Sequence, residues 1–143
     1  MKIGGTFDAH AAMAALSKKA AEIDKVSALA LKRAGLVVER AAKEKLSEQG
    51  RHEKGTPTPS QPGQPPSIIT SALRASVKTG QPDRKGFGSY EVLVGPTITY
   101  GRVQELGGGP KGLPARPYMA PAWAESADKA QAELVRVWKE ALF

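Results

Sequence analysis

The sequence predicts an α+β fold: a long N-terminal helix and a C-terminal helix packed on one face of a small antiparallel sheet, in a single domain of residues 1–143. Residues 7–46 contain no proline and are dominated by Ala, Leu, Lys and Glu, which favours helix. Tyr90, Val92 and Val94 alternate with Glu91 and Leu93, which is the period of a half-buried strand. After Pro121, apolar residues return at helical spacing. A chain of this length can bury a modest core.

The N-terminal stretch is expected to be helical from Phe7 to Leu46. Asp24 is the expected N-cap for its second part, about 24 residues and about 36 Å long. A shorter helix is expected around His10–Lys19, with a join near Ala21–Asp24. Glycine in the middle of a helix is less stable than alanine by about 1 kcal/mol. Either the close approach of another backbone or simple tolerance of this cost would explain Gly35. One apolar face is formed by Val26, Leu29, Ala30, Ala34, Val37, Ala41 and Leu46.

Residues 50–66 have the composition of a linker. They hold five of the eleven prolines, three glycines and no large apolar side chain. Such a segment cannot bury enough surface to offset the entropy lost on ordering. We therefore expect a long, flexible and disordered Pro/Gly loop within the domain, and a loop of this length is usually functional or disordered.

Ordered structure is expected to resume at residue 67 with a helical turn capped by Thr70 or Ser71, which leads into a strand near Val77. A polar turn over residues 81–86 then joins this strand to the strand at 90–94. Two such strands form a hairpin that needs a further partner, and the helices would supply it.

Glycine and proline divide the last third of the chain. Gly95 and Pro96 end the strand, and residues 107–110 (Gly-Gly-Gly-Pro) begin a second flexible loop that acts as a hinge. Pro121 suits the first turn of the last helix. The apolar stripe of that helix, expected to face the sheet or the long helix, comprises Trp123, Ala127, Ala130, Leu134, Val137, Trp138 and Leu142.

The residues needed for catalysis or metal binding are scarce. The chain has no cysteine, two histidines (His10 and His52) and no carboxylate pair at ligand spacing, so no catalytic, cofactor or metal site is predicted. Asp8 with His10 is the best pair an enzyme could use, but a capping Asp beside an exposed His explains it more simply. The glycines after Leu106 lack the Lys-Ser ending of a phosphate loop. No membrane span and no enzymatic activity are predicted.

The net charge of +7 is unevenly distributed. Residues 49–90 hold six basic and two acidic residues, whereas residues 91–143 hold six of each. A basic half indicates an anionic neighbour, nucleic acid or an acidic protein face, or simply a soluble basic loop. No DNA-binding motif is recognisable, so any DNA contact would be to the backbone. The candidates for contact with DNA or an acidic partner are Arg51, Lys54, Arg84 and Lys85.

Four segments in order carry a family resemblance. Residues 34–40 lie in the N-terminal helix, residues 65–77 (PPSIITSALRASV) resemble "PPS…TG.LR.SI", residues 94–107 resemble "VGP…YA.I.E.G", and residues 114–122 resemble "PARPFL.PA". The chain thereby resembles, over about residues 28–125, the tail-completion or head–tail joining (neck) proteins of long-tailed phages. That group includes lambda minor tail protein Z and its shorter relatives.

Two positions depart from the family pattern: Ser71 stands where glycine is usual, and Gly101 where alanine is usual. The resemblance implies an α+β subunit without catalytic activity that forms a homo-oligomeric ring, six- or twelve-fold, at the top of the tail tube. It implies head connector or stopper, tail tube and terminator proteins as partners, and DNA in the channel. The protein would be made in the host cytoplasm and reside in the virion. A tail terminator ring protein and a non-specific DNA-binding protein are the alternatives.

A ring subunit makes heterologous contacts, in which one surface meets a different surface of its neighbour. Proline-fixed loops suit such contacts because little entropy is lost on docking, and tyrosine and arginine are favoured anchors. The candidates for the subunit or partner interface are Tyr100, Arg102, Glu105, Arg116 and Tyr118. The alternative is that both tyrosines pack internally and both arginines are solvated.

Overall fold

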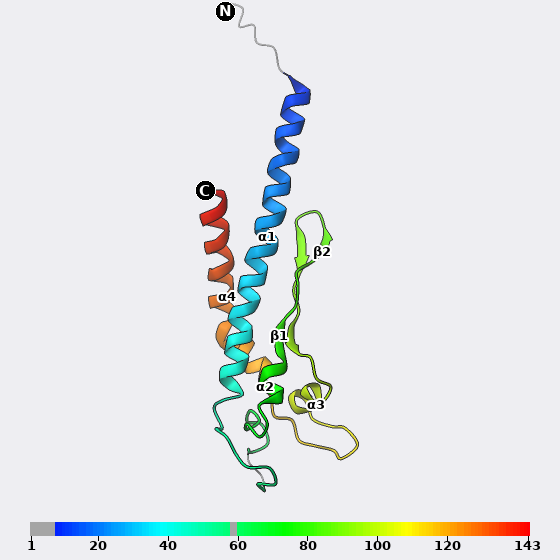
Figure 1. Cartoon of the computed structure of the whole chain (residues 1–143), viewed down its shortest axis with the longest axis vertical. Coiled ribbons are helices and arrows are strands. Elements are labelled where there is room, and N and C mark those ends of the chain that lie inside the picture. Colours follow the sequence, from blue (N-terminus) through cyan, green and yellow to red (C-terminus); the bar gives the residue numbers. More distant parts are fainter. Residues whose placement is uncertain (1–7, 58–59) are drawn as a thin grey trace, which may run out of the picture.

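The computed structural model describes residues 8–57 and 60–143. It confirms the α+β class: two long helices pack together beside a narrow antiparallel ribbon (Figure 1). In chain order the elements are α1 (Ala9–Lys45), α2 (Ala72–Ser76), β1 (Val77–Thr79), β2 (Asp83–Gly86), β3 (Ser89–Glu91), β4 (Val94–Pro96), α3 (Tyr100–Leu106) and α4 (Met119–Leu142).

Helix α1 is one unbroken helix of 37 residues. The side chain of Asp8 caps it by accepting hydrogen bonds from the backbone N–H groups of His10 and Ala11, both at 3.0 Å. The predicted join near Ala21–Asp24 is wrong, because nothing there breaks the helix and alanine-rich sequence carries it through. Asp24 is therefore not a cap; its carboxylate pairs with the Arg84 guanidinium at 3.0 Å.

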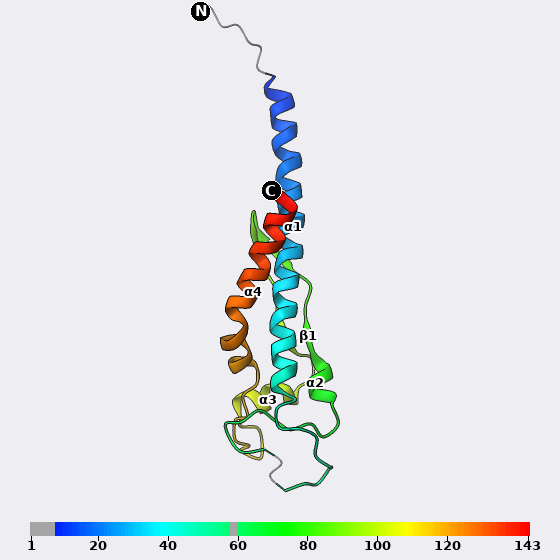
Figure 2. The same ribbon diagram turned by 90° about the vertical axis from the view of Figure 1, so that its left-hand side faces the viewer.

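Helix α4 runs antiparallel to α1, and the two are in contact over most of the length of α4 (Figure 1). Small side chains allow the close approach: Ala34 and Val38 of α1 meet Ala130 of α4 in one buried cluster. Val137 of α4 is also buried, as its place in the predicted stripe requires. Turned by 90°, the molecule shows α1 extending well past the C-terminal end of α4 (Figure 2).

The strands form one long hairpin with an interruption. Strand β1 pairs with β4, and β2 pairs with β3 further along. The predicted turn at 81–86 is wrong in position, because residues 83–86 form β2 and the chain reverses between Gly86 and Ser89. Gly95 and Pro96 end the strand as predicted, since β4 spans Val94–Pro96. Proline is tolerated there because both strands of a two-stranded sheet are edge strands.

Polar side chains of α1 hold the end of β1. The Lys32 Nζ donates to the carbonyls of Thr79 and Gly80, both at 2.7 Å. One carboxylate oxygen of Glu39 accepts from the Thr79 N–H at 2.7 Å and from its hydroxyl at 2.8 Å. Gly35 lies between these two anchors, and a Cβ there would be 2.6 Å from the Thr79 methyl. Close approach of a ribbon side chain, rather than of a backbone, therefore explains this glycine.

The Glu39 carboxylate is held at this contact by hydrogen bonds from both Lys43 and Thr79. Burial alone raises its pKa, but hydrogen bonds from Lys43 and Thr79 outweigh burial and leave the pKa below its ordinary value of 4.5. The charged form is thus the one that the folded protein stabilises.

Ser71 precedes α2 with φ +62°, in the left-handed region that glycine adopts without strain. It holds the predicted cap position, but its hydroxyl makes no cap bond; the Thr70 hydroxyl accepts weakly from Ala72 N–H at 3.4 Å. This φ gives a physical reason for the glycine that the resembled family usually has here.

Two irregular segments lie at the foot of the molecule, at the opposite end from the start of α1 (Figure 1). In the predicted loop the described residues contain no helix or strand beyond a bridge between Arg51 and Ile68. Its mobility stays a prediction. The second loop is tighter than expected: Gly108 N–H donates to the Leu113 carbonyl at 2.7 Å and the reverse bond is 2.9 Å. A turn closed by two such bonds is not an open hinge.

Candidate functional site

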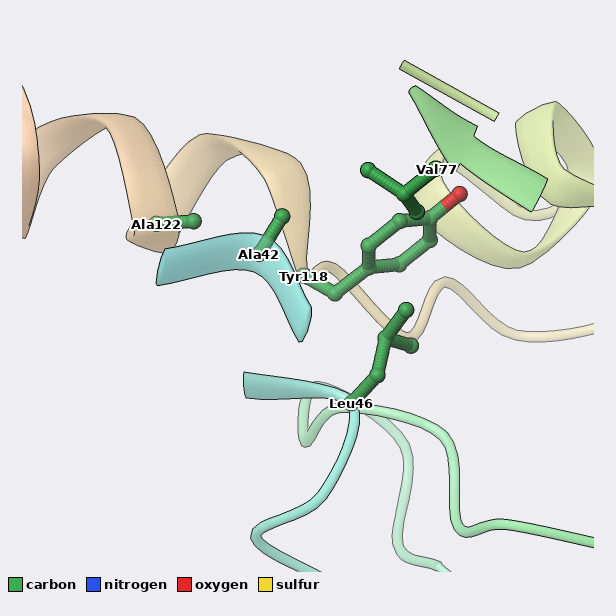
Figure 3. Close-up of a cluster of buried hydrophobic side chains, with 5 residues drawn as sticks. All are labelled: Ala42, Leu46, Val77, Tyr118 and Ala122. Carbon is green, nitrogen blue, oxygen red and sulfur yellow. The ribbon is translucent and has the colours of Figure 1, made fainter. Parts of the chain in front are cut away.

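Tyr118, an interface candidate, lies inside the subunit. Its ring is fully buried among Ala42, Leu46, Val77 and Ala122, which come from α1, β1 and α4 and the turn after α1 (Figure 3). Its hydroxyl donates to the Gly101 carbonyl at 3.1 Å. Burial, then the charge of Glu105, raises the pKa of this hydroxyl above its ordinary range. Tyr118 is therefore an anchor of the core, the alternative that the sequence left open.

Glu105 caps a helix that is distant in sequence. One oxygen of its carboxylate accepts from the N–H groups of Tyr118 at 2.7 Å and Met119 at 2.9 Å. The other oxygen accepts from the Ala120 N–H at 2.9 Å. These are the unpaired donors at the start of α4, and a negative charge there complements the helix dipole. The carboxylate is thereby engaged within the subunit.

Arg116 connects this region to the 50–66 loop. Its guanidinium donates to the Ser60 carbonyl at 3.3 Å, and its backbone N–H donates to the Gln104 carbonyl at 2.7 Å. The Gly63 N–H donates to the Ala115 carbonyl at 2.9 Å. Arg116 is half-buried, and its Nε has no partner among the described residues. Its observed role is to hold the loop against the chain that leads into α4.

Tyr100 and Arg102 are the two interface candidates that lie on the surface. Both belong to α3; the Tyr100 side chain is 46% exposed, and Arg102 is exposed without an ion pair among the described residues. Leu106, at the end of the same helix, is also exposed. This short helix thus offers one aromatic, one cationic and one aliphatic group to a neighbour.

The four basic candidates do not form one patch. Arg51 and Lys54 lie in the loop at the foot of the molecule, whereas Arg84 and Lys85 lie in the β2–β3 hairpin beside the middle of α1 (Figure 1). Arg51 donates to the Ser71 hydroxyl at 3.0 Å, and Lys54 is exposed. Arg84 is paired with Asp24.

Lys85 is also paired with carboxylates. Its ammonium contacts Asp83 and Glu91, and these hydrogen bonds raise its pKa, with Asp83 the larger cause. Two of the four basic side chains therefore already have anionic partners within the chain, which lowers the positive charge available to DNA.

An apolar groove is the surface feature that sequence reasoning missed. It has a volume of about 830 Å³ and opens between α1, the strands from Tyr90 to Val94, and α4. Trp123 was expected to face the sheet or the long helix, but it is 57% exposed at the groove wall, and Trp138 is also partly exposed. The groove lining includes Leu31, Val38, Val92, Met119, Trp123 and Leu134.

The groove exists because α4 carries a wider apolar stripe than α1 can cover. Ala122, Ser126, Ala130 and Val137 are buried, whereas Trp123 lies one step round the helix and is not. Soluble monomers rarely leave a contiguous apolar surface of this kind without a use. The signal for the groove in the sequence was the pair of tryptophans in the last helix. The facing surface of the long helix is mostly alanine, and such small side chains cannot cover two indole rings completely.

The groove lining does not bring together side chains that could act as catalytic groups or metal ligands. The groove lining holds one carboxylate, Glu91, and no histidine. In the described part of the chain no three His, Asp or Glu side chains come together as metal ligands would. Across residues 8–57 and 60–143, no helix combines the length and apolar character of a membrane span. What the site offers is an apolar contact surface.

The segments that carry the family resemblance lie in mutual contact. Gly101 packs against Pro96 and the Tyr118 hydroxyl. An added Cβ would be 2.6 Å from the proline ring and 3.1 Å from the hydroxyl, so the alanine that is usual in the resembled family does not fit this packing. Comparison with family models, with curated proteins and with solved structures finds no match.

Proposed function

We propose that this chain is a structural subunit of the neck of a long-tailed phage, a ring-forming tail-completion or head–tail joining protein. One observation carries the proposal. The segments 94–107 and 114–122, which resemble the family in sequence, form one packed unit in which Glu105 caps α4 and Tyr118 reaches Gly101. Mutual contact of this kind argues that their order reflects a shared structure rather than Gly/Pro-rich composition.

The surface supports an assembly part. A subunit of a closed ring needs two different surfaces that meet each other on neighbouring copies. This chain has an apolar groove beside Trp123 and, separately, exposed residues on α3 that include Tyr100 and Arg102. With no cofactor or catalytic residue assigned to it, the protein would act by binding its copies and the connector and tail proteins around it. A tail terminator ring of the same neck has the same physical requirements.

Two measurements test the proposal. Native mass spectrometry with electron microscopy of the purified chain should show closed rings of one stoichiometry at high concentration. Proteomic analysis of tailed particles produced by the source genome should find the chain, and deletion of its gene should yield separate heads and tails. Particles that lack the chain and form normal tails after deletion would overturn the proposal.

Non-specific DNA binding is the alternative from another class, and net charge is the observation that favours it. It predicts that affinity for a duplex falls steeply between about 50 and 200 mM salt. Fluorescence anisotropy with a labelled duplex measures this directly. Because Arg84 and Lys85 are paired with carboxylates, we expect the 51–54 segment to make any such contact; Arg51→Ala should therefore weaken it more than Arg84→Ala.

A further inference from the structure

The N-terminal part of α1 has no partner within the described chain. Residues 9–21, called here the free end, contain no buried residue, and Figure 2 shows α1 projecting past the end of α4. Two large apolar side chains on it, Met13 and Leu16, are 64% and 67% exposed. Because α1 continues without a break into its packed part, the free end can stay helical, but its large apolar side chains are left without cover.

The free end continues an interface that already exists in the fold. Alternating steps of four and three residues connect one stripe of small or apolar residues along α1: Ala9, Met13, Leu16, Ala20, Ile23, Ser27, Ala30, Ala34, Val37 and Ala41. Lower down, Ala30 and Ala34 of this stripe are buried, and Ala34 packs with Ala130 of α4. The same spacing predicts that a helical surface covers Met13 and Leu16.

The groove matches the free end in length and chemistry. Along α4 it extends from Met119 to Leu134, about 22 Å at the helical rise, and the free end is about 20 Å long. Its volume of about 830 Å³ is apolar and open to solvent beside Trp123. The walls of the groove are helices and strands of one chain. A helix bound in the groove would therefore cover the apolar surface that these walls leave exposed to solvent.

The net charges of the two surfaces are opposite. The free end carries Lys18 and Lys19, with Glu22 just beyond it. The one charged side chain in the groove lining is the carboxylate of Glu91. Attraction between the two surfaces favours their encounter.

We propose that the free end of α1 docks in the apolar groove of the next copy of this chain, a contact that rests on the ring proposed above and names the surfaces that close it. The contact is heterologous, because helix end and groove are different surfaces, so it propagates from copy to copy. Pairing of two free ends with each other would offer only about two heptads, fewer than a coiled coil sustains.

Cysteine cross-linking tests the contact directly, because the chain contains no cysteine. Leu16→Cys places a thiol on the free end and Ala127→Cys places one in the groove. Under oxidising conditions the double variant should give a ladder of covalent multimers, and each single variant should remain monomeric on a denaturing gel. The matched control combines Ala127→Cys with Ala11→Cys, on the opposite side of α1, and should give no ladder.

A second variant measures how much this contact contributes to the affinity of self-association. Leu16→Asp should weaken self-association at least about tenfold in analytical ultracentrifugation, because an apolar anchor is replaced by a charge. Circular dichroism should be unchanged, since Leu16 is exposed in the monomer. Ala11→Asp should associate as the unchanged chain does.

The experiments distinguish failure of the docking proposal from failure of the neck proposal. Dimers from Leu16→Cys alone would mean that free ends pair with each other, and rings that form with no ladder would mean that another surface closes them; both overturn the docking while the neck proposal stands. A chain that stays monomeric at high concentration and is absent from tailed particles overturns both proposals.

Discussion

Removal of the Glu105 carboxylate should destabilise the whole subunit, although the residue lies on a short surface helix. In Glu105→Ala the N–H groups of Tyr118, Met119 and Ala120 lose their acceptor together. Tyr118 is fully buried, so water cannot freely replace the carboxylate at its N–H. The start of α4 would therefore fray beside the residue that fills the lower core.

The size of the loss follows from two contributions. Loss of a helix cap costs about 0.5–2 kcal/mol, and loss of the charge at the positive end of the helix dipole adds about 0.3–1 kcal/mol. We expect Glu105→Ala to lower the free energy of unfolding by about 1–3 kcal/mol and Glu105→Gln, which keeps an acceptor oxygen, by about 1 kcal/mol. For a chain of 143 residues the melting temperature should fall by about 4 °C per kcal/mol.

Urea denaturation followed by far-UV circular dichroism measures both variants, at a concentration at which light scattering shows monomers. The dependence on urea should keep its slope, because the surface exposed on unfolding is unchanged. Asp128→Ala is the control: it removes an exposed carboxylate from α4 itself and should alter stability by less than about 0.5 kcal/mol. If Glu105→Ala unfolds at the same urea concentration as the unchanged chain, the capping argument fails.

Four further substitutions test other parts of the fold. Gly107→Ala should cost about 2–4 kcal/mol in urea denaturation, because φ is +74° and the added Cβ would be 2.8 Å from facing backbone atoms. Gly108→Ala, with φ +92° and open space, should cost about 1–2 kcal/mol, and equal losses would refute the steric argument. Because folding lowers the pKa of Glu39, its stabilisation is present above pH 4.5 and is lost as the pH falls through the folded pKa. Glu39→Gln should flatten the stability profile in that acid range, and an unchanged acid slope would count against it. Ser71→Gly should raise stability by up to about 1 kcal/mol by relieving the left-handed φ; a lower melting temperature would show that the lost Ser71 hydrogen bond matters more.

Local patterns in the sequence were enough to predict the two long helices. Ala30 and Ala34 on one helix and Ala130 on the other follow the predicted helical periodicity and are buried. The predicted face of α1 was wrong at Leu29, which is 47% exposed, and it left out Val38, which is buried. The join near Asp24 was wrong because the Asp24 carboxylate pairs with Arg84 instead of capping a helix, and residue type alone does not distinguish these two uses. The hairpin turn was misplaced because residues 83–86 are polar on both faces, and an exposed ribbon has no apolar alternation to mark it.

The candidate site was harder to predict for a different reason. Tyrosine and carboxylate anchors serve equally well within a subunit and between subunits, so residue type could not tell which use Tyr118 and Glu105 have. Both are satisfied internally. The groove depends on how α1, α4 and the ribbon are spaced, and no segment alone encodes that spacing. Trp123 was placed on the correct helix but given the wrong degree of burial.

The cluster around Tyr118 also has a consequence for the order in which the chain folds during synthesis. It joins Ala42 and Leu46 to Ala122, so it cannot form until residue 122 has left the ribosome. At about 5–20 residues per second, the roughly 80 residues between them take about 4–16 s to appear. Throughout that interval the apolar stripe of α1 is outside the ribosome without α4 to cover it. A nascent chain with an uncovered apolar helix face of this kind is a substrate for chaperones that bind exposed apolar helices.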